Sequence, residues 1–236
     1  MFQDHFSNKA SIYAEHRPSY PSELIDFLAS VAPATDLAWD CGCGSGQMAV
    51  PLAERFAHVI ATDASAEQVA HATPHPSVEY RHAPAERSGI RDNAVDLVVA
   101  AQAAHWFDLP AFYAEAQRVA RHGAVIALVT YDLLEVNATI DRTIRDFYAS
   151  LTWPPERRLV EQRYASMPFP FEEMEAPQFF MRNAWNAEQL IGYVHTWSAV
   201  RNSDTSDFEK DVRAVWCDEV RPVRWPMSMR LGKVSS

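Results

Sequence analysis

Glycine and cysteine are scarce in this chain, and acidic side chains outnumber basic ones. Among 236 residues there are seven glycines and three cysteines, and the net charge is −10. Nucleic-acid grooves need a basic footprint, so this balance argues against a general binder of phosphate backbones. Three cysteines cannot form a disulfide framework, and a C-x-C pair is shorter than the usual spacing of metal ligands. We therefore expect reduced thiols, no metal site, no nucleic-acid partner and a cytoplasmic location.

Long apolar runs are also missing. No uncharged stretch approaches the ~18 apolar residues of a membrane span, and the N-terminus MFQDHFSNKA has no signal-peptide core. A hydrophobic content of 48% and a charged content of 22% are ordinary for a globular protein. The length suffices for one sizeable α/β core with a modest appendage. We expect a single domain over 1–236 that has no membrane partner and is a monomer or homodimer.

Strands and helices alternate through the first half of the chain. The run 94–101 is almost entirely apolar, as in a parallel strand buried on both faces. Such alternation predicts a doubly wound parallel sheet of the α/β class. The expected strands are 37–40, 58–62, 78–82, 94–101 and 123–131. The expected helices are 21–32, 47–56, 65–72 and 108–120.

The second half is less regular, because the proline-rich segments WPPERR and MPFPFEEMEAP interrupt it. Apolar spacing and a capping-box pattern at Asn186 and Gln189 still predict further elements. The expected elements are helices at 136–150, 186–200 and 207–220, a strand at 178–185 and a closing strand at 225–234.

Three of the seven glycines alternate directly after the first predicted strand, in D-C-G-C-G-S-G from Asp40 to Gly46. Glycine tolerates positive φ and close approach of other groups. A strand that breaks into such a loop before a helix predicts a cradle of exposed backbone N–H groups. The dinucleotide fingerprint G-x-G-x-x-G/A fits poorly, because its third small residue would fall on Gln47.

The same D-C-G-C-G-S-G segment resembles motif I of the class I S-adenosylmethionine-dependent methyltransferases. The resemblance implies a Rossmann-like fold with a mostly parallel seven-stranded sheet, an antiparallel last strand and a helical cap. It implies S-adenosyl-L-methionine as cofactor, held by a core at 34–131, with the cap and closing strands at 132–236. In the family the acidic residue, here Asp40, lies near the ammonium group of the cofactor, and Gly42, Gly44 and Gly46 form the loop beside it.

Two further acidic positions follow the next strands. Asp63 ends the second strand, where a carboxylate suits a ribose cis-diol, and Ala64 follows it; a charge at a helix N-terminus is the alternative. Ala85 and Glu86 occupy the place where the family contacts adenine, although a solvated loop glutamate is nearly as plausible.

The segment AAQAAHWFD, residues 100–108, places Gln102, His105 and Trp106 at the carboxyl end of a central strand, where α/β sheets bind ligands. It resembles a signature of small-molecule methyltransferases related to trans-aconitate methyltransferases, as do YAEHRPSYP near the N-terminus and YVHTWSAVR at 193–201. In that subgroup the N-terminal segment, here 1–32, covers the cofactor. The resemblance therefore implies Tyr13 and Arg17 as further cofactor-pocket residues.

The resemblance favours methyl transfer to a small organic acceptor, with a carboxylic acid steered by Arg17 or Arg201 as one hypothesis. His105 is the candidate general base if the acceptor needs one, and a hydrogen-bonded structural histidine is the alternative. Trp106, Trp197 and Arg201 are candidate acceptor-pocket residues, although aromatic residues in a cap usually pack its own core.

Rival functions remain open at this point. A non-catalytic S-adenosylmethionine-binding protein or sensor would use the same pocket. An NAD-dependent oxidoreductase is disfavoured by the glycine spacing. Nucleic-acid methylation is disfavoured by acidity and protein methylation by the compact insert.

Overall fold

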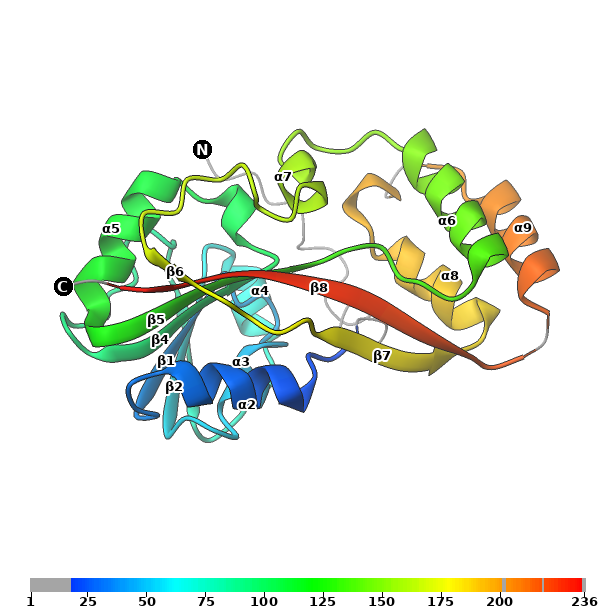
Figure 1. Ribbon diagram of the computed structural model, residues 1–236. Coiled ribbons are helices and arrows are strands. Elements are labelled where there is room, and N and C mark those ends of the chain that lie inside the picture. The colour runs from blue at the N-terminus through cyan, green and yellow to red at the C-terminus, as the bar shows by residue number, and fades with distance from the viewer. Residues whose placement is uncertain (1–17, 201–202, 218, 235–236) are drawn as a thin grey trace.

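A mostly parallel sheet forms the centre of the protein, which Figure 1 shows as a computed structural model that describes residues 18–200, 203–217 and 219–234. The sheet order is β3-β2-β1-β4-β5-β8-β6, with β1 to β5 parallel and β8 antiparallel to β5. This confirms the predicted doubly wound α/β fold with an antiparallel last strand. The strand bounds are β1 Leu37–Cys41, β2 His58–Asp63, β3 Val78–His82, β4 Val95–Ala101, β5 Ala120–Tyr131, β6 Glu172–Met174, β7 Phe180–Trp185 and β8 Arg221–Lys233.

The sheet has one strand more than the seven predicted. β6 and β7 both pair with β8, at opposite parts of its length. β6 is only three residues long and lies between prolines 170 and 177. A strand that short shows no readable alternation, so sequence patterning could not reveal it.

Local signals account for most helix starts. The side chain of Asp108 accepts a hydrogen bond from the backbone N–H of Ala111, and Asn186 and Gln189 form the expected capping box. The helix predicted at 47–56 is shorter, since i→i+3 bonds such as Glu54 N to Pro51 O follow α3. The helix bounds are α2 Ser22–Val31, α3 Ala49–Leu52, α4 Ala66–Ala70, η1 Ala104–Trp106, α5 Leu109–Val119, α6 Ala138–Ser150, α7 Arg157–Glu161, α8 Ala187–His195, η2 Ser198–Val200 and α9 Ser206–Trp216.

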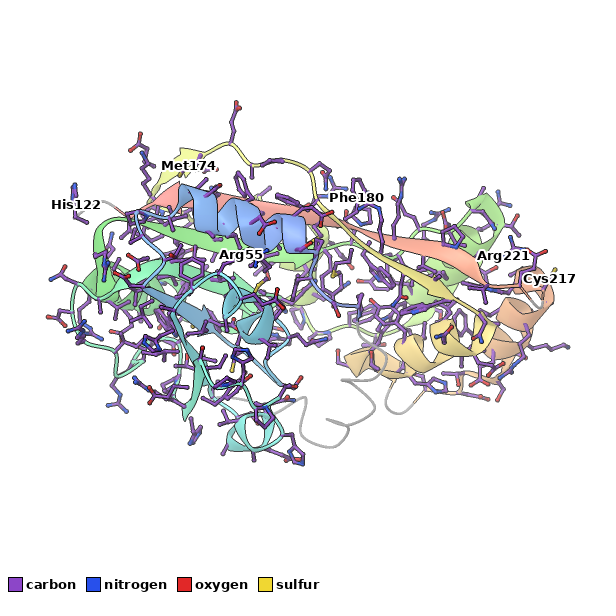
Figure 2. All side chains as sticks on the ribbon, turned by 90° about the horizontal axis from the view of Figure 1, so that it is seen from below. Arg55, His122, Met174, Phe180, Cys217 and Arg221 are labelled. Atoms are coloured by element: carbon purple, nitrogen blue, oxygen red, sulfur yellow. The ribbon has the colours of Figure 1, made fainter. Side chains whose placement is uncertain are left out.

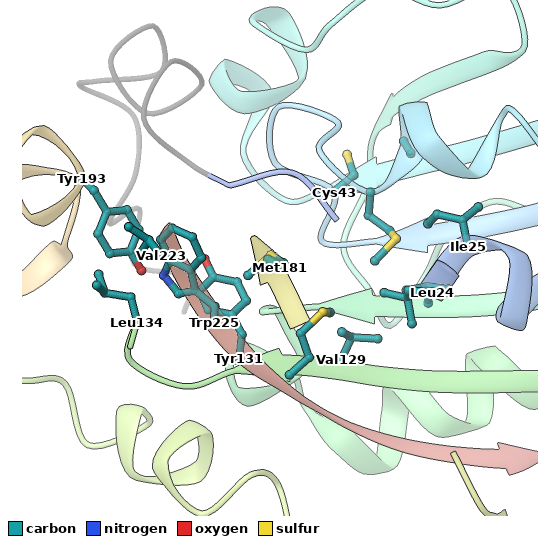
Figure 3. Packing of buried hydrophobic residues seen from close by; sticks show 14 of the residues in the cluster. Leu24, Ile25, Cys43, Val129, Tyr131, Leu134, Met181, Tyr193, Val223 and Trp225 are labelled. Atoms are coloured by element: carbon teal, nitrogen blue, oxygen red, sulfur yellow. The ribbon is translucent and has the colours of Figure 1, made fainter. Parts of the chain in front are cut away.

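Two apolar clusters cover the two faces of the sheet. One joins α2 and the core strands to the helical end of the molecule, as Figure 3 shows for Leu24, Val129, Met181 and Trp225. The other lies under α5 and includes the segment around Tyr164. Because one cluster is continuous from α2 to α9, the helical end is packed onto the sheet as part of the same fold.

Helices α6, α8 and α9, here called the cap, gather beside β7 at one end of β8 (Figure 1). The rings of Phe147 on α6 and Phe208 on α9 stack with centroids 4.2 Å apart. In Figure 2, Cys217 and Arg221 mark the cap end of the molecule, whereas Met174 lies toward the opposite end. No helix in the described ranges is long and apolar enough to cross a membrane.

Candidate functional site

A cavity of about 1170 Å³ opens at the carboxyl ends of β1, β2 and β4. A smaller chamber of about 80 Å³ adjoins it. Both are lined by Gln102, His105, Trp106, Tyr131, Trp153, Pro154 and Ser198. This is the edge at which open α/β sheets bind ligands, because strand order reverses there between β1 and β4.

The glycine loop forms one wall of the cavity. Its backbone N–H groups make hydrogen bonds within the loop and to the end of β2. The N–H groups of Gly42 and Cys43 donate to the carbonyl of Thr62, and that of Gly46 donates to the carbonyl of Cys43. The N–H of Gly44 donates to Asp63 Oδ2 over 2.8 Å. The expected cradle of exposed N–H groups is therefore wrong for these four positions, because the loop uses those donors to hold its own shape.

The close approach of neighbouring atoms explains these glycines better than a cradle of exposed N–H groups does. Gly46 has a φ of +90°, and a Cβ there would lie 2.1 Å from the hydroxyl of Tyr80. Gly44 has a φ of +53°, and its added Cβ would meet only Gln68 Oε1, at 3.8 Å. Both conformations disfavour larger residues. Gly46 makes room for a protein side chain, whereas Gly44 leaves space on the cavity side.

Asp40, at the end of β1, is a buried carboxylate that lines the cavity. Neither of its oxygens has a hydrogen-bond partner in the part of the chain that the structure describes. Burial, and then the nearby charge of Asp63, raise the pKa of Asp40 to about 8, against an opposing effect of the Ala49 backbone. A buried carboxyl without partners is unfavourable unless a cation or donor meets it, so the group fits a ligand that carries an ammonium.

Asp63 lies across the loop from Asp40. Its Oδ2 accepts from Gly44 N and its Oδ1 accepts from Ser65 N, each over 2.8 Å. Since a carboxylate has about four lone-pair sites, one carboxylate can serve these backbone donors and a diol together. Ala64 also lines the cavity, and its carbonyl bonds His82 Nε2 over 3.1 Å.

The predicted adenine-side residues reach the same cavity. Ala85 is buried there, and Glu86 Oε1 accepts from the backbone N–H of Asp108 over 2.9 Å. Gln102 has a φ of +54°, an uncommon conformation for a residue other than glycine, and its Nε2 donates to the carbonyl of Tyr131 over 3.2 Å. Backbone strain of this kind concentrates at ligand sites.

His105 stands where the cavity and the chamber meet, so part of its ring faces the open space while protein encloses the rest. Its Nδ1 lies 2.8 Å from the hydroxyl of Tyr164. Burial, and then the positive charge of Arg157, lower the pKa of His105 to about 3. The imidazole is therefore neutral at pH 7 and is a weak proton acceptor.

Aromatic rings wall the chamber. The Trp197 ring centroid is 5.7 Å from that of Trp153 and 5.9 Å from that of Tyr193. Arg157 lines the chamber with its guanidinium carbon 5.2 Å from the Trp153 ring centroid, while its Nε donates to Tyr148 Oη over 2.8 Å. Arg157 is the only arginine or lysine among the described residues that line either space.

The predicted residues fall into three groups. Those at Asp40, Gly42, Gly44, Asp63, Ala64, Ala85, Glu86, Gln102, His105 and Trp106 all line the large cavity, and Trp197 lines the chamber. Gly46 lies in the loop wall but is not among the lining residues. Tyr13, Arg17 and Arg201 lie outside the described residues.

Two residues of this site were not among the functional candidates predicted from the sequence. Arg157 follows a proline pair that reads as an interruption, and Tyr164 is 59 residues from the histidine that it contacts. Their only sequence signal is the presence of a cation and an aromatic residue in an otherwise irregular segment.

Comparison with known proteins agrees with this geometry. The family model described as "Methyltransferase domain" matches residues 39–128. A Dictyostelium discoideum protein named "Putative methyltransferase" is 33% identical over 204 residues, which cover 84% of this chain and 78% of that protein. An uncharacterized methyltransferase of Mycobacterium tuberculosis is 36% identical over 125 residues, and the match spans only 51% of its length.

A solved structure from Anaeromyxobacter dehalogenans, named a "Putative Type II Methyltransferase", is also similar. It shares 43% identity and superposes with a TM-score of 0.87, covering 93% of this chain and 98% of its own. Together with the buried acidic residue and the glycine loop at the end of β1, these matches place the chain in the class I S-adenosylmethionine-dependent methyltransferases, with S-adenosylmethionine as its cofactor.

Proposed function

We propose that this methyltransferase acts on a small organic acceptor, with a carboxylic acid as the favoured class. The observation that carries this proposal is the aromatic chamber of about 80 Å³ that adjoins the main cavity and contains Arg157. At about 1170 Å³ the main cavity exceeds the roughly 300–1,000 Å³ of a typical ligand site. There is room for a cofactor and a small acceptor together.

Charge is distributed unevenly between the two spaces. Asp40, Asp63 and Glu86 lie around the main cavity, whereas the chamber contains Arg157 together with Asp132, which is paired with Arg163. We assign the acidic side to the cofactor: Asp40 to its ammonium, Asp63 to its ribose, and Ala85 and Glu86 to its adenine. Gly42, Gly44, Ala64 and Gln102 complete that side.

Arg157 supports the acid assignment. No described carboxylate forms a salt bridge with it, although its Nε is held by Tyr148, whose hydroxyl in turn donates to Glu161 over 2.6 Å. The terminal nitrogens of a guanidinium suit a carboxylate in a bidentate pair. The role expected for Arg17 or Arg201 is thus also open to Arg157, inside the described site.

The bound cofactor supplies a methyl group on a sulfonium, which is already an activated electrophile. The protein then contributes mainly positioning, by holding the acceptor between His105, Trp106 and the aromatic walls. A carboxylate acceptor needs no proton removed, which agrees with the low pKa of His105. We also propose that the protein belongs to the trans-aconitate methyltransferase subgroup. It is proposed to be cytoplasmic and to be a monomer or homodimer.

The test is a cofactor-consumption assay against pooled small carboxylic acids, phenols and amines, with mass detection of products. We expect methyl esters. With an acid substrate, Arg157→Gln should raise KM roughly tenfold or more while cofactor affinity stays unchanged. Arg158→Gln is the matched control, because the exposed Arg158 is adjacent and does not line either space.

Methylation of amines or phenols alone would overturn the carboxylic-acid assignment. An unchanged KM in Arg157→Gln would overturn the role of Arg157. Arg17 and Arg201 would then be the candidates for binding the acid.

A further inference from the structure

The contact between Tyr164 and His105 joins two distant parts of the chain at the mouth of the chamber. The Tyr164 side chain is completely buried, and its hydroxyl lies 2.8 Å from His105 Nδ1. In the described part of the chain, His105 Nε2 has no hydrogen-bond partner, and His105 lines both the cavity and the chamber. One nitrogen of the ring is therefore held by the protein, and the other is left for a ligand.

The backbone that delivers Tyr164 adopts an uncommon conformation. Arg163 and Tyr164 have φ values of +54° and +60° in succession. The Arg163 side chain pairs with Asp132 over 2.8 Å, and Arg230 donates to the carbonyl of Met167 over 2.6 Å. Two consecutive left-handed residues persist only where surrounding contacts enforce them, which is typical of functional sites.

The direction of the hydrogen bond follows from burial. A buried phenol needs an acceptor for its proton, and His105 Nδ1 is its hydrogen-bond partner. Buried Thr130 Oγ1 lies near the Tyr164 hydroxyl and lowers the pKa of Tyr164 as a hydrogen-bond donor does, although the pair has no hydrogen bond of normal geometry. If Nδ1–H instead donated to Tyr164, the phenol proton would have to turn to Thr130 Oγ1, with which Tyr164 has no hydrogen bond of normal geometry.

Burial keeps both groups neutral. Burial raises the pKa of Tyr164 far above its ordinary value, and burial together with Arg157 lowers that of His105. The other charged side chains lining these spaces near His105 are Asp132, which is paired with Arg163, and Glu156 and Asp108. A neutral histidine whose Nδ1 accepts a hydrogen bond carries its proton on Nε2.

We propose that Tyr164 is a positioning residue that donates to His105 Nδ1 and so presents His105 Nε2–H as a hydrogen-bond donor to an oxygen of the acceptor. This inference rests on the proposed function for the nature of the acceptor. It assigns His105 the role of orienting an oxygen that is already deprotonated, and no proton passes through the ring. The acceptor class that fits is a carboxylate or another oxyanion.

The tautomer of His105 can be measured without knowing the acceptor. Long-range ¹H–¹⁵N spectra of the full chain with labelled histidine distinguish Nε2–H from Nδ1–H, and His105→Gln assigns the signal. We expect the Nε2–H tautomer and no titration of His105 between about pH 5 and pH 8. An Nδ1–H tautomer, or a titration near pH 6.5, would overturn the proposal.

Tyr164→Phe removes only the hydroxyl and should convert the single tautomer to a mixture. Tyr113→Phe is the matched control, because the Tyr113 hydroxyl donates to the carbonyl of Pro168 over 2.8 Å and does not contact His105. The control should leave the His105 signals unchanged. A Tyr164→Phe spectrum that matches the wild type would contradict the positioning role.

Once an acceptor is identified, Tyr164→Phe should lower kcat roughly tenfold with little change in the KM for cofactor, whereas Tyr113→Phe should not. The spectra test the tautomer even if no pooled acid is methylated. Failure of the proposed substrate class and failure of this inference are therefore distinguishable.

Discussion

The carboxylate of Asp63 and the backbone N–H of Gly44 are joined by a hydrogen bond of 2.8 Å. The other oxygen of Asp63 accepts from Ser65 N over the same distance. One side chain at the end of β2 thus holds the glycine loop after β1 and the start of α4. Asp63 shapes the cavity wall in addition to facing the cavity.

We expect Asp63→Asn to lose both stability and cofactor affinity. An amide has one acceptor oxygen, so its NH₂ group would face one of the two backbone donors and leave it unsatisfied. The loss of unfolding free energy should be about 1–3 kcal/mol, and affinity for S-adenosylhomocysteine should fall roughly tenfold or more. Thermal denaturation and calorimetry measure the two effects.

Asp211→Asn provides the control, since Asp211 is exposed on α9 and far from the cavity in sequence and fold. A stable Asp63→Asn protein that binds the cofactor normally would show that the two backbone bonds are dispensable.

Three glycine substitutions separate conformational strain from steric exclusion. Gly89 has a φ of +70° with open space around it, so Gly89→Ala should cost only about 1 kcal/mol of stability. Gly44→Ala should cost a similar amount but weaken cofactor binding, because its methyl group would occupy the cavity side. Gly46→Ala should be the least stable, since its Cβ would lie 2.1 Å from the Tyr80 hydroxyl.

Chemical denaturation of the three variants, together with calorimetric titration of S-adenosylhomocysteine, checks this order. Normal binding by Gly44→Ala would mean that the ligand does not approach the loop at that position. Equal stability of Gly46→Ala and Gly89→Ala would mean that Tyr80 moves aside freely.

Asp40 should make the stability of the ligand-free protein depend on pH. Its pKa of about 8 in the folded chain is above the ordinary value of 3.8, so the folded state binds more protons than the unfolded state between these values. Stability should therefore fall as pH rises through that window. Asp40→Asn removes this dependence, and its stability advantage over the wild type should increase from about pH 5 to pH 8, as measured by urea denaturation.

Cofactor binding should remove the proton from Asp40. At pH 7 a group with a pKa of about 8 is mostly protonated, whereas an ammonium ligand favours the carboxylate. Binding of S-adenosylhomocysteine should release close to one proton per site, measured by calorimetry in buffers of different ionisation enthalpy. Asp40→Asn should bind weakly and release none. Equal proton release by the variant would assign the proton to another group.

The predicted fold depended on signals that are local in the chain. The apolar run of β4 and the capping residues Asp108 and Asn186 define elements from a few neighbours each. β4 and α5 have nearly the predicted bounds, and α8 starts as predicted but ends at His195 instead of residue 200. β6 was not predictable, because its pairing to β8 decides its extent. The early end of α3 was not predictable either, since i→i+3 bonds replace helical ones after Leu52.

That the acidic candidate residues would share one cavity was predictable for a related reason. In parallel α/β sheets the residues that follow successive strands come to one edge, so Asp40, Asp63 and Gln102 could be placed together from their positions alone. The hydrogen bonds made at that edge could not be predicted in the same way. The loop donors that seemed available for a ligand are bonded to Thr62, Cys43 and Asp63.

The sequence by itself determined the class of fold, the cofactor family and the edge of the sheet where the cavity opens, because these follow from periodicity and from a short contiguous motif. Only the tertiary structure decided that Tyr164 holds His105 and that Arg157 faces the chamber, since both contacts join residues about fifty positions or more apart in the chain. It also decided the buried state of Asp40. Desolvation and long-range contacts arise only when distant segments pack together, and no local pattern records them.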